Sequence, residues 1–194
     1  LYGSTYTLGF DTATNTVVEA IDKIRDTADA HDRLFFIEVM GRDSGAIALR
    51  AGVCCGAEAI LLPEKATAID DLIKNLKEGQ HNKKSSSIVI VAEGDKNGGV
   101  YDIARRVQSE VKIYDIKVTI LGHLQRGGSP SAFDRVLGSR LGYAAVKALL
   151  KGHTQKMVGL QANYIKLTSI EEALTQHEFK LEEDLMEMAD ILSI

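Results

Sequence analysis

The feature that most constrains the fold of this chain is a set of four short apolar runs that do not alternate with polar residues. The runs are rich in Ile, Val, Leu and Phe, and they span residues 34–39, 59–62, 88–92 and 116–121. A continuous apolar run of this length is typical of a strand that is buried on both faces of a parallel sheet. The sequence therefore predicts a central parallel sheet with helices covering both of its faces.

Amphipathic helical patterns separate these runs. Apolar side chains recur at helical spacing in residues 11–30, 66–79 and 101–111. Strand and helix thus alternate between residues 34 and 121, which favours an α/β fold. We predict a Rossmann-like, three-layer domain built around the parallel sheet.

The last third of the chain has a different pattern. Residues 131–151 predict one long helix, with Pro130 near its first turn and Gly152 past its end. The short apolar run at residues 157–160 predicts a final strand. Residues 170–188 form a charged, amphipathic segment near the end of the chain.

Composition narrows the class of protein. Of the 194 residues, 45% are hydrophobic and 26% are charged, as in ordinary globular proteins. The formal net charge of −4 argues against nucleic acid as the main partner, and no stretch is long and apolar enough to span a bilayer. The only cysteines, Cys54 and Cys55, are adjacent. We expect both to be small buried residues of a reduced, cytoplasmic protein.

Polar or glycine-containing segments follow three of the four apolar runs. These segments are residues 40–45, 93–94 and 122–130. Ligands of parallel α/β sheets gather where loops leave the carboxyl ends of the strands. We therefore expect the three segments to lie close together and to form a ligand site.

The side chains in these segments suit a phosphorylated polyol. Arg42, His123 and Arg126 are donors to phosphate, and a guanidinium can donate through two parallel bonds. Glu93 accepts hydrogen bonds only, which suits sugar hydroxyls. Taken singly, each residue has a structural interpretation, such as a solvated turn charge, a hydrogen-bonded histidine or a helix-initiating carboxylate. Their coincidence at three strand ends favours a binding pocket.

Two segments resemble signatures of the 6-phosphofructokinases. They are residues 36–42 and residues 121–130, the second of which reads Leu-Gly-His-Leu-Gln-Arg-Gly-Gly-Ser-Pro. Residues 3–13 and 60–64 are similar to the same family, and the resemblance runs in order from the start of the chain to about residue 160. The chain is identified as resembling the carboxy-terminal part of a bacterial-type enzyme of this family.

The resemblance implies a glycolytic kinase that phosphorylates fructose 6-phosphate to fructose 1,6-bisphosphate with ATP and Mg²⁺. Pyrophosphate stays open as an alternative donor. The family's bacterial enzymes are cytoplasmic, allosteric homotetramers. The resemblance also assigns a set of sugar-phosphate-binding residues, namely Met40, Gly41, Arg42, Glu93, His123 and Arg126.

Two further groups of residues are implied by the same resemblance. Arg33 and Lys117 would reach the phosphate of a neighbouring subunit's substrate. Lys117 stands where many bacterial members have arginine, so it keeps the charge but loses the bidentate fork. An effector site between subunits, for a nucleotide or phosphoenolpyruvate, would include Arg25, Gly56, Glu58 and Lys84.

The resemblance places the donor-binding glycine-rich loop, the Mg²⁺ ligand and the catalytic base before the first residue of this chain. We therefore expect no catalytic residue and no metal ligand here, and no cofactor bound by this part alone. Phosphoryl transfer depends on positioning the donor and neutralising its charge, so the isolated chain should have no turnover. Asp43, the nearest substitute base, is expected to cap the helix that follows Arg42.

The resemblance also divides the chain between two domains. Residues 1–128 and 157–165 would form the sugar-phosphate-binding α/β domain. Residues 129–156 and 166–194 would be helical segments that belong to, or pack on, the absent amino-terminal domain. The apolar residues of the long helix would then lack a partner, and the isolated chain should expose them and tend to associate.

Two other functions were weighed. A non-enzymatic sugar-phosphate-binding module fits the same pocket, and the upstream coding sequence, with or without a donor loop and an acidic base, decides between the two. A dinucleotide-binding domain fits less well, because no Gly-x-Gly-x-x-Gly opens a strand–helix unit.

Overall fold

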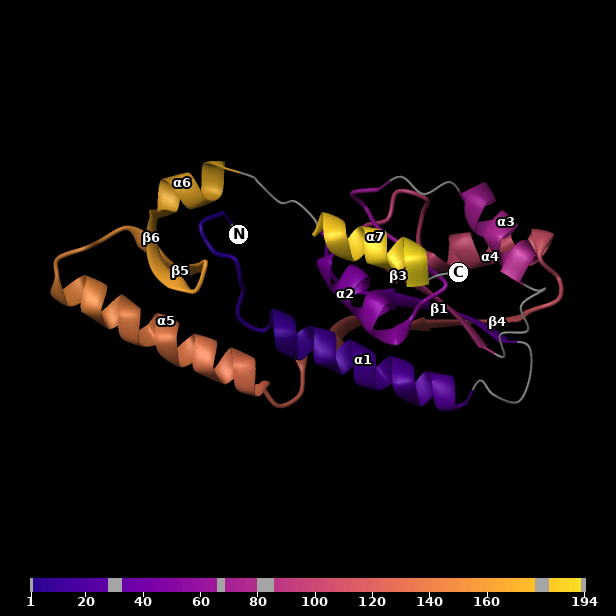
Figure 1. Ribbon diagram of the computed structural model, residues 1–194, viewed down its shortest axis with the longest axis horizontal. Helices are drawn as coiled ribbons and strands as arrows, with labels where there is room; N and C mark the ends of the chain where they lie inside the picture. Colours follow the sequence, from indigo (N-terminus) through magenta and orange to yellow (C-terminus); the bar gives the residue numbers. More distant parts are fainter. Residues whose placement is uncertain (1, 28–32, 66–68, 80–85, 177–181, 193–194) are drawn as a thin grey trace. The chain divides into compact units, whose positions relative to one another are not determined.

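A computed structural model describes residues 2–27, 33–65, 69–79, 86–176 and 182–192 (Figure 1). The chain divides into two compact units, which we describe separately. The sheet unit comprises Ala13–Gly127 and Leu181–Ile194, and the hairpin unit comprises Leu1–Thr12 and Gly128–Lys180. None of the helices in these described stretches is both long and apolar enough to cross a membrane.

The sheet unit is built on a parallel sheet with strand order β2-β3-β1-β4. The four strands are β1 (Arg33–Val39), β2 (Ala59–Leu61), β3 (Ser86–Ala92) and β4 (Asp115–Ile120). Each strand coincides with one of the four apolar runs. The predicted α/β class with a parallel central sheet is confirmed.

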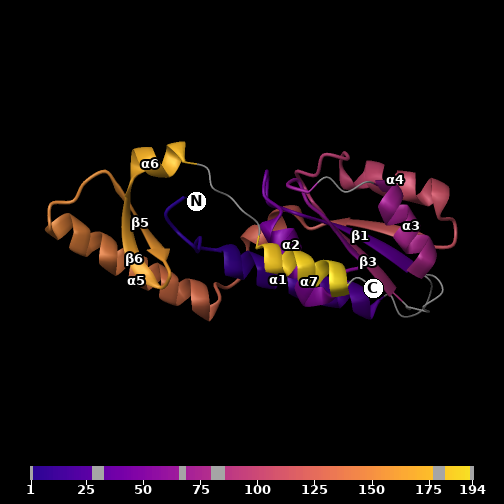
Figure 2. The same cartoon turned by 45° about the horizontal axis from the view of Figure 1, so that its top comes forward.

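Helices cover both faces of this sheet, which gives three layers (Figure 2). The helices of the unit are α1 (Phe10–Asp26), of which residues 10–12 belong to the hairpin unit, α2 (Ala46–Cys55), α3 (Ile69–Gly79), α4 (Val100–Glu110) and α7 (Glu183–Leu192). Apolar residues of α1 and α2 join the core on one face, and those of α3 and α4 join the core on the other. The amphipathic patterns predicted α1, α3 and α4, because each of these three helices buries only one side.

Strand β1 shows why the apolar runs are continuous. Phe35, Ile37 and Val39 lie in one core, whereas Leu34 and Phe36 lie in the other. Successive side chains of a strand point to opposite faces, so a strand with helices on both sides needs apolar residues at every position.

Strand β4 departs from the predicted burial on both faces. It is an edge strand, and its side chains are only partly buried or exposed. Ile120 is 48% exposed. Apolar residues alone do not distinguish an edge strand from a central one, since the difference depends on which strands pair beside it.

The hairpin unit contains one long helix and an antiparallel pair of strands. Its elements are α5 (Ala132–Leu150), β5 (Lys156–Gln161), β6 (Tyr164–Ser169) and α6 (Ile170–Thr175). The long helix and the strand at 157–160 were predicted. Residues 166–169 were expected in a helical segment and instead belong to β6. The turn between the strands has positive φ at Ala162 and Asn163, which matches the right-handed twist of a hairpin.

The packing of two helices bears on the expected domain division. Helix α7 was expected among the segments that pack on an absent domain, yet it packs against α2, and its Leu185 and Met186 lie against the core. On α5, Val146 and Leu149 are exposed as expected, whereas Leu137 is buried. The division of the complete protein into domains stays a prediction.

Candidate functional site

The register of the sheet brings the three polar segments to one edge. Val39 of β1 pairs with Ala92 of β3, and Glu38 pairs with Ile120 of β4. The Glu93 N–H donates to the Val39 carbonyl at 2.9 Å, and the Leu121 N–H donates to the Glu38 carbonyl at 3.1 Å. The segments therefore leave neighbouring strands side by side, and we call this region the carboxyl edge.

The Glu93 carboxylate holds the segment that follows β1. Its Oε1 accepts hydrogen bonds from the Gly41 N–H at 3.2 Å and from the Arg42 N–H at 2.5 Å. Arg42 has a φ of 54°, a left-handed conformation that costs a non-glycine residue about 1–2 kcal/mol. A Cβ added to Gly94 would lie 2.0 Å from the Arg42 carbonyl oxygen, so only glycine allows this approach. Glu93 and Gly94 thus fix the backbone of Arg42.

A second side chain holds the same segment from the other side. The Oε1 of Gln125 accepts a hydrogen bond from the Met40 N–H at 3.2 Å. Gln125 lies in a short 3₁₀ helix, η2 (Gly122–Arg126), which follows β4 and also carries His123 and Arg126. Sequence reasoning did not assign Gln125 a role, and no local signal marks it, because its burial depends on the neighbouring strand.

The hydrogen-bond-donating side chains at the carboxyl edge are exposed. Arg42, His123 and Arg126 all face solvent. Within the described stretches of the chain, none of these three side chains has an ion-pair or hydrogen-bond partner, and the bonds of Glu93 use only its Oε1. The carboxyl edge thus combines three uncommitted donors with one uncommitted carboxylate oxygen, a set that matches a sugar phosphate.

The residue that caps the beginning of α2 differs from the one predicted from the sequence. Asp43 was expected to cap this helix, but Asp43 is exposed and the Gly45 N–H donates to both carboxylate oxygens of Glu64, at 2.9 and 3.1 Å. The hydroxyl of Ser44 accepts a further bond from the Ala46 N–H. The carboxylate of Glu64 therefore supplies a negative charge and an acceptor at this helix terminus.

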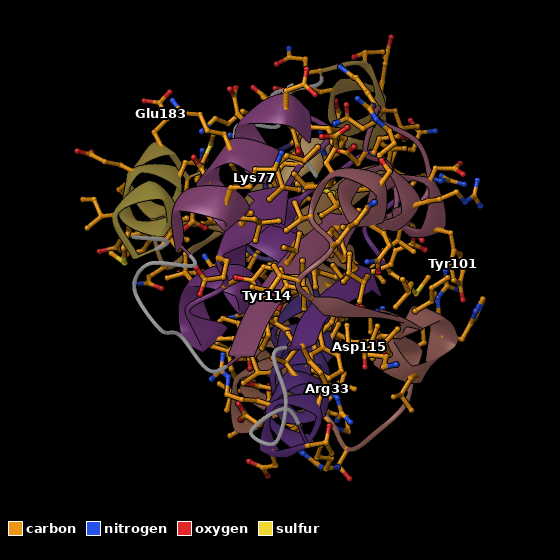
Figure 3. The ribbon with its side chains drawn as sticks, turned by 90° about the vertical axis from the view of Figure 1, so that its right-hand side faces the viewer. Arg33, Lys77, Tyr101, Tyr114, Asp115 and Glu183 are labelled. Carbon is orange, nitrogen blue, oxygen red and sulfur yellow. The ribbon has the colours of Figure 1, made fainter. Side chains whose placement is uncertain are left out.

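Arg33 and Lys117 are not brought to the carboxyl edge. Arg33 begins β1, roughly 20 Å of strand from Val39. Its Nε lies 3.9 Å from Asp115 Oδ2 (Figure 3). The Lys117 Nζ lies 2.9 Å from Asp115 Oδ1. Both cations therefore share one carboxylate at the amino edge of the sheet. Their expected role toward a neighbouring subunit's substrate stays a prediction.

Two of the expected effector residues meet at the end of α2. The Arg25 guanidinium donates to the Cys55 carbonyl, and Gly56 closes the helix with φ 58° and ψ 52°. Cations stabilise the carboxyl end of a helix, where carbonyls lack partners. Glu58 follows at the start of β2, where its N–H donates to Ile88, and Lys84 lies outside the described residues.

The two cysteines at this helix end differ. Cys55 is buried as expected, whereas Cys54 is exposed, because neighbouring residues of a helix point in different directions. Burial raises the pKa of the Cys55 thiol to about 11, the charge of Asp22 adds to the increase, and Arg25 opposes it. Cys55 is therefore protonated and unreactive at neutral pH.

A separate hydrogen-bond network lies in the hairpin unit, around Asp134. Its Oδ1 accepts from the Gly9 N–H at 2.9 Å, and its Oδ2 accepts from the Thr12 N–H at 2.8 Å and the Thr12 hydroxyl at 2.5 Å. The Ser131 N–H donates to Thr12 Oγ1, and Ser131 Oγ accepts from the Asp134 N–H. Asp134 is only 6% exposed. It thus joins the start of α1 to the start of α5.

These bonds set the charge state of Asp134. Burial alone would raise the pKa of this carboxyl group, but the Thr12 hydroxyl and the Gly9 and Thr12 amides outweigh it and lower the pKa. Sequence reasoning missed this role, because the two partners of Asp134 lie more than 120 positions earlier in the chain.

Comparison with known proteins identifies relatives of the chain. A family model described as Phosphofructokinase matches residues 1–149. The chain is 47% identical over 194 residues to ATP-dependent 6-phosphofructokinase 2 of Bacteroides thetaiotaomicron, covering all of this chain and 59% of that protein. It is 50% identical over 189 residues to ATP-dependent 6-phosphofructokinase of Brevibacillus brevis, covering 97% of this chain and 58% of that protein. The chain therefore spans about three fifths of the length of these curated relatives.

Solved structures share the fold. Phosphofructokinase from Saccharomyces cerevisiae matches with a TM-score of 0.80 and 31% identity, covering 98% of this chain and 25% of that one. Phosphofructokinase from Pichia pastoris in the T-state matches with a TM-score of 0.87 over 99% of this chain and 26% of that one, and its 23% identity shows the fold alone.

Proposed function

This chain belongs to the phosphofructokinase family, and we therefore propose that it is the carboxy-terminal part of an ATP-dependent 6-phosphofructokinase. The complete enzyme would transfer a phosphoryl group to the 1-hydroxyl of fructose 6-phosphate in glycolysis. ATP is favoured as the donor because the curated relatives at 47% and 50% identity are ATP-dependent. A pyrophosphate-dependent enzyme from Marinobacter aquaeolei matches at only 21% identity, which speaks to the fold and not to the donor.

The carboxyl edge is the proposed binding site for fructose 6-phosphate. Arg42, His123 and Arg126 would bind the phosphate and sugar, and the Glu93 Oε2 would accept from sugar hydroxyls. The observation that supports this most is the bond of Glu93 Oε1 to the Arg42 N–H, at 2.5 Å. This bond joins Glu93 and Arg42, two predicted ligand residues that follow different strands.

The donor site and the catalytic base are proposed to lie in the part of the relatives that this chain does not span. Among the described residues, no group of three or more His, Cys, Asp or Glu side chains is placed to hold a metal ion. We assign no Mg²⁺ ligand and no catalytic step to this chain. Its own residues would bind and orient the acceptor sugar.

The hairpin unit is proposed to pack on that same absent part. Apolar residues of α5 such as Val136, Val146 and Leu149 are at least half exposed. Between α5 and β6 lies an open cavity of about 400 Å³, lined by residues that include Tyr143, Ile165 and Leu167. An exposed apolar surface of this kind on a folded unit indicates a missing partner. We propose that residues 157–165, which form β5, the turn and the start of β6, go with α5 and not with the sugar-phosphate-binding domain.

Cytoplasmic location and assembly into homotetramers are proposed for the complete enzyme. The edge strand β4, with Ile113 and Ile120 exposed nearby, supports pairing with a second copy. Arg33 and Lys117, which lie at the amino edge, would then serve a neighbouring subunit. Arg25, Gly56 and Glu58 would contribute to an effector site.

The proposal is tested by assaying the complete polypeptide with fructose 6-phosphate and either ATP or pyrophosphate. We expect turnover with ATP, and none from the 194-residue chain alone, because phosphoryl transfer needs a bound donor and its charge neutralisation. Binding of fructose 6-phosphate without turnover by the complete polypeptide would favour the alternative, a non-enzymatic binding module. Turnover by the chain alone would contradict the assignment of the donor site.

A further inference from the structure

The amide of Gln125 is a buried polar group among exposed neighbours. Gln125 is only 4% exposed, whereas His123, Leu124 and Arg126 of the same short helix η2 face solvent. Burying an amide costs free energy unless both of its ends are hydrogen-bonded. Hydrogen bonds to the amide must therefore compensate for the burial of Gln125.

Both ends of this amide are satisfied by backbone groups. The Oε1 accepts from the Met40 N–H at 3.2 Å, and the Nε2 donates to the Gly122 carbonyl at 3.0 Å. The first bond reaches the segment after β1, while the second stays within η2. The side chain thus connects the two segments that carry the proposed phosphate-binding cations.

The Met40 N–H lies where the sheet no longer supplies a partner. The pairing of β1 ends at Val39 on the side of β3 and at Glu38 on the side of β4. The Gln125 Oε1 accepts a hydrogen bond from the Met40 N–H, the first N–H after Val39. It thus extends the hydrogen bonding of β1 by one residue. Without it, this N–H would lose its partner in the protein, which destabilises this conformation of the segment.

Glu93 and Gln125 together hold three consecutive amides. Gln125 takes the N–H of Met40, and Glu93 takes those of Gly41 and Arg42. The segment is therefore fixed from both neighbouring strand ends. Glu93 is exposed and its second oxygen is uncommitted, whereas Gln125 is buried and both of its polar atoms are used.

We propose that Gln125 is a positioning residue of the sugar-phosphate site, one that sets Met40 to Arg42 against His123 and Arg126 without touching the sugar. This inference rests on the proposed function. If residues 40–42 are ordered in only a fraction of the molecules, the apparent affinity for the ligand that they bind falls in proportion to that fraction. Loss of the Gln125 amide should therefore weaken binding of fructose 6-phosphate and leave binding of ATP unchanged.

The test compares Gln125→Met with Gln108→Met in the complete polypeptide. Methionine keeps the unbranched shape and removes the amide. Gln108 is the matched control, since it is an exposed amide on α4 whose Nε2 donates to the Tyr114 carbonyl at 3.4 Å. We expect Gln125→Met to raise the Kd and KM for fructose 6-phosphate about tenfold. The KM for ATP, the kcat at saturating sugar and the Gln108→Met values should stay within about twofold.

A second readout does not depend on turnover. Hydrogen–deuterium exchange of the peptide that contains Met40 should become faster in Gln125→Met, because its amide loses its acceptor. Gln125→Leu serves if Gln125→Met does not fold. Unchanged affinity for fructose 6-phosphate, equal losses for both substrates, or failure of both variants to fold would each overturn the proposal. A wild-type polypeptide that binds no fructose 6-phosphate would overturn the proposed function and this inference together.

Discussion

The carboxylates of Asp134 and Glu93 both hold backbone amides, but they do so in different ways. Asp134 in the hairpin unit is buried, and both of its oxygens accept bonds from the start of α1. Glu93 at the carboxyl edge is exposed and uses one oxygen only. The first carboxylate is saturated by the fold, whereas the second keeps capacity for a ligand. We infer that Asp134 acts on stability and that Glu93 acts on binding.

The largest effect is expected from Asp134→Ala. This change leaves the Gly9 and Thr12 amides without their acceptor, and bonds to a charged group contribute about 1.5–3 kcal/mol each. Because the losses are not additive, we expect the free energy of unfolding of the complete polypeptide to fall by about 3 kcal/mol. Urea denaturation measures it. A stability within about 0.5 kcal/mol of wild type would break the contrast between the two carboxylates.

Arg126→Ala tests the binding side of the contrast. A phosphate that loses its charged donor costs about 1.5–3 kcal/mol, which corresponds to a rise of roughly 10- to 150-fold in the KM for fructose 6-phosphate. Arg105→Ala is the control, because Arg105 is an exposed arginine on α4 that pairs with Asp102. Steady-state kinetics of the complete polypeptide measure the KM for fructose 6-phosphate of both variants. An unchanged KM in Arg126→Ala removes this residue from the pocket.

The sequence predicted the carboxyl edge better than the networks that support it. The runs at 34–39 and 88–92 predict strands of a parallel sheet, and polar segments that follow parallel strands must share an edge. Gln125 and Asp134 could not be assigned in this way. Their bonds join positions separated by 85 and by 122 or more residues, so they depend on tertiary contacts that no local pattern encodes.

The strand that the sequence did not predict, and the packing of α7, have a similar origin. Strand β6 was missed because its turn uses Ala162 and Asn163 at positive φ, without the glycine that usually marks a hairpin. Helix α7 is amphipathic, as the sequence indicated, but amphipathicity does not say which surface covers the apolar side. It covers α2.

Glu93→Gln separates the two tasks of the Glu93 carboxylate. Glutamine keeps an acceptor for the Gly41 and Arg42 amides but has no negative charge. We expect the KM for fructose 6-phosphate to rise about fivefold, since one hydrogen bond to a charged group is exchanged for a neutral one. Glu93→Ala should raise the KM further, because it removes both the loop contact and the sugar contact. Equal effects of the two variants would show that holding the loop contributes nothing to binding.

The smallest expected effect concerns the pH dependence of stability. Burial opposes ionisation of Asp134, but the hydrogen bonds from Thr12 and Gly9 together outweigh it and lower the pKa in the folded state below its ordinary value of 3.8. A lowered folded-state pKa contributes stability that is present above the unfolded-state pKa and is lost as the pH falls through the folded-state pKa. The stability difference between wild type and Asp134→Asn should therefore be present at pH 7, at about 1 kcal/mol, and shrink below pH 3.8. Denaturation of both proteins across this range measures it. A stability difference that does not change with pH would show that the ionised carboxylate stabilises the start of α1 no more than a neutral amide does. Asp134 and Glu93 would then differ only in burial.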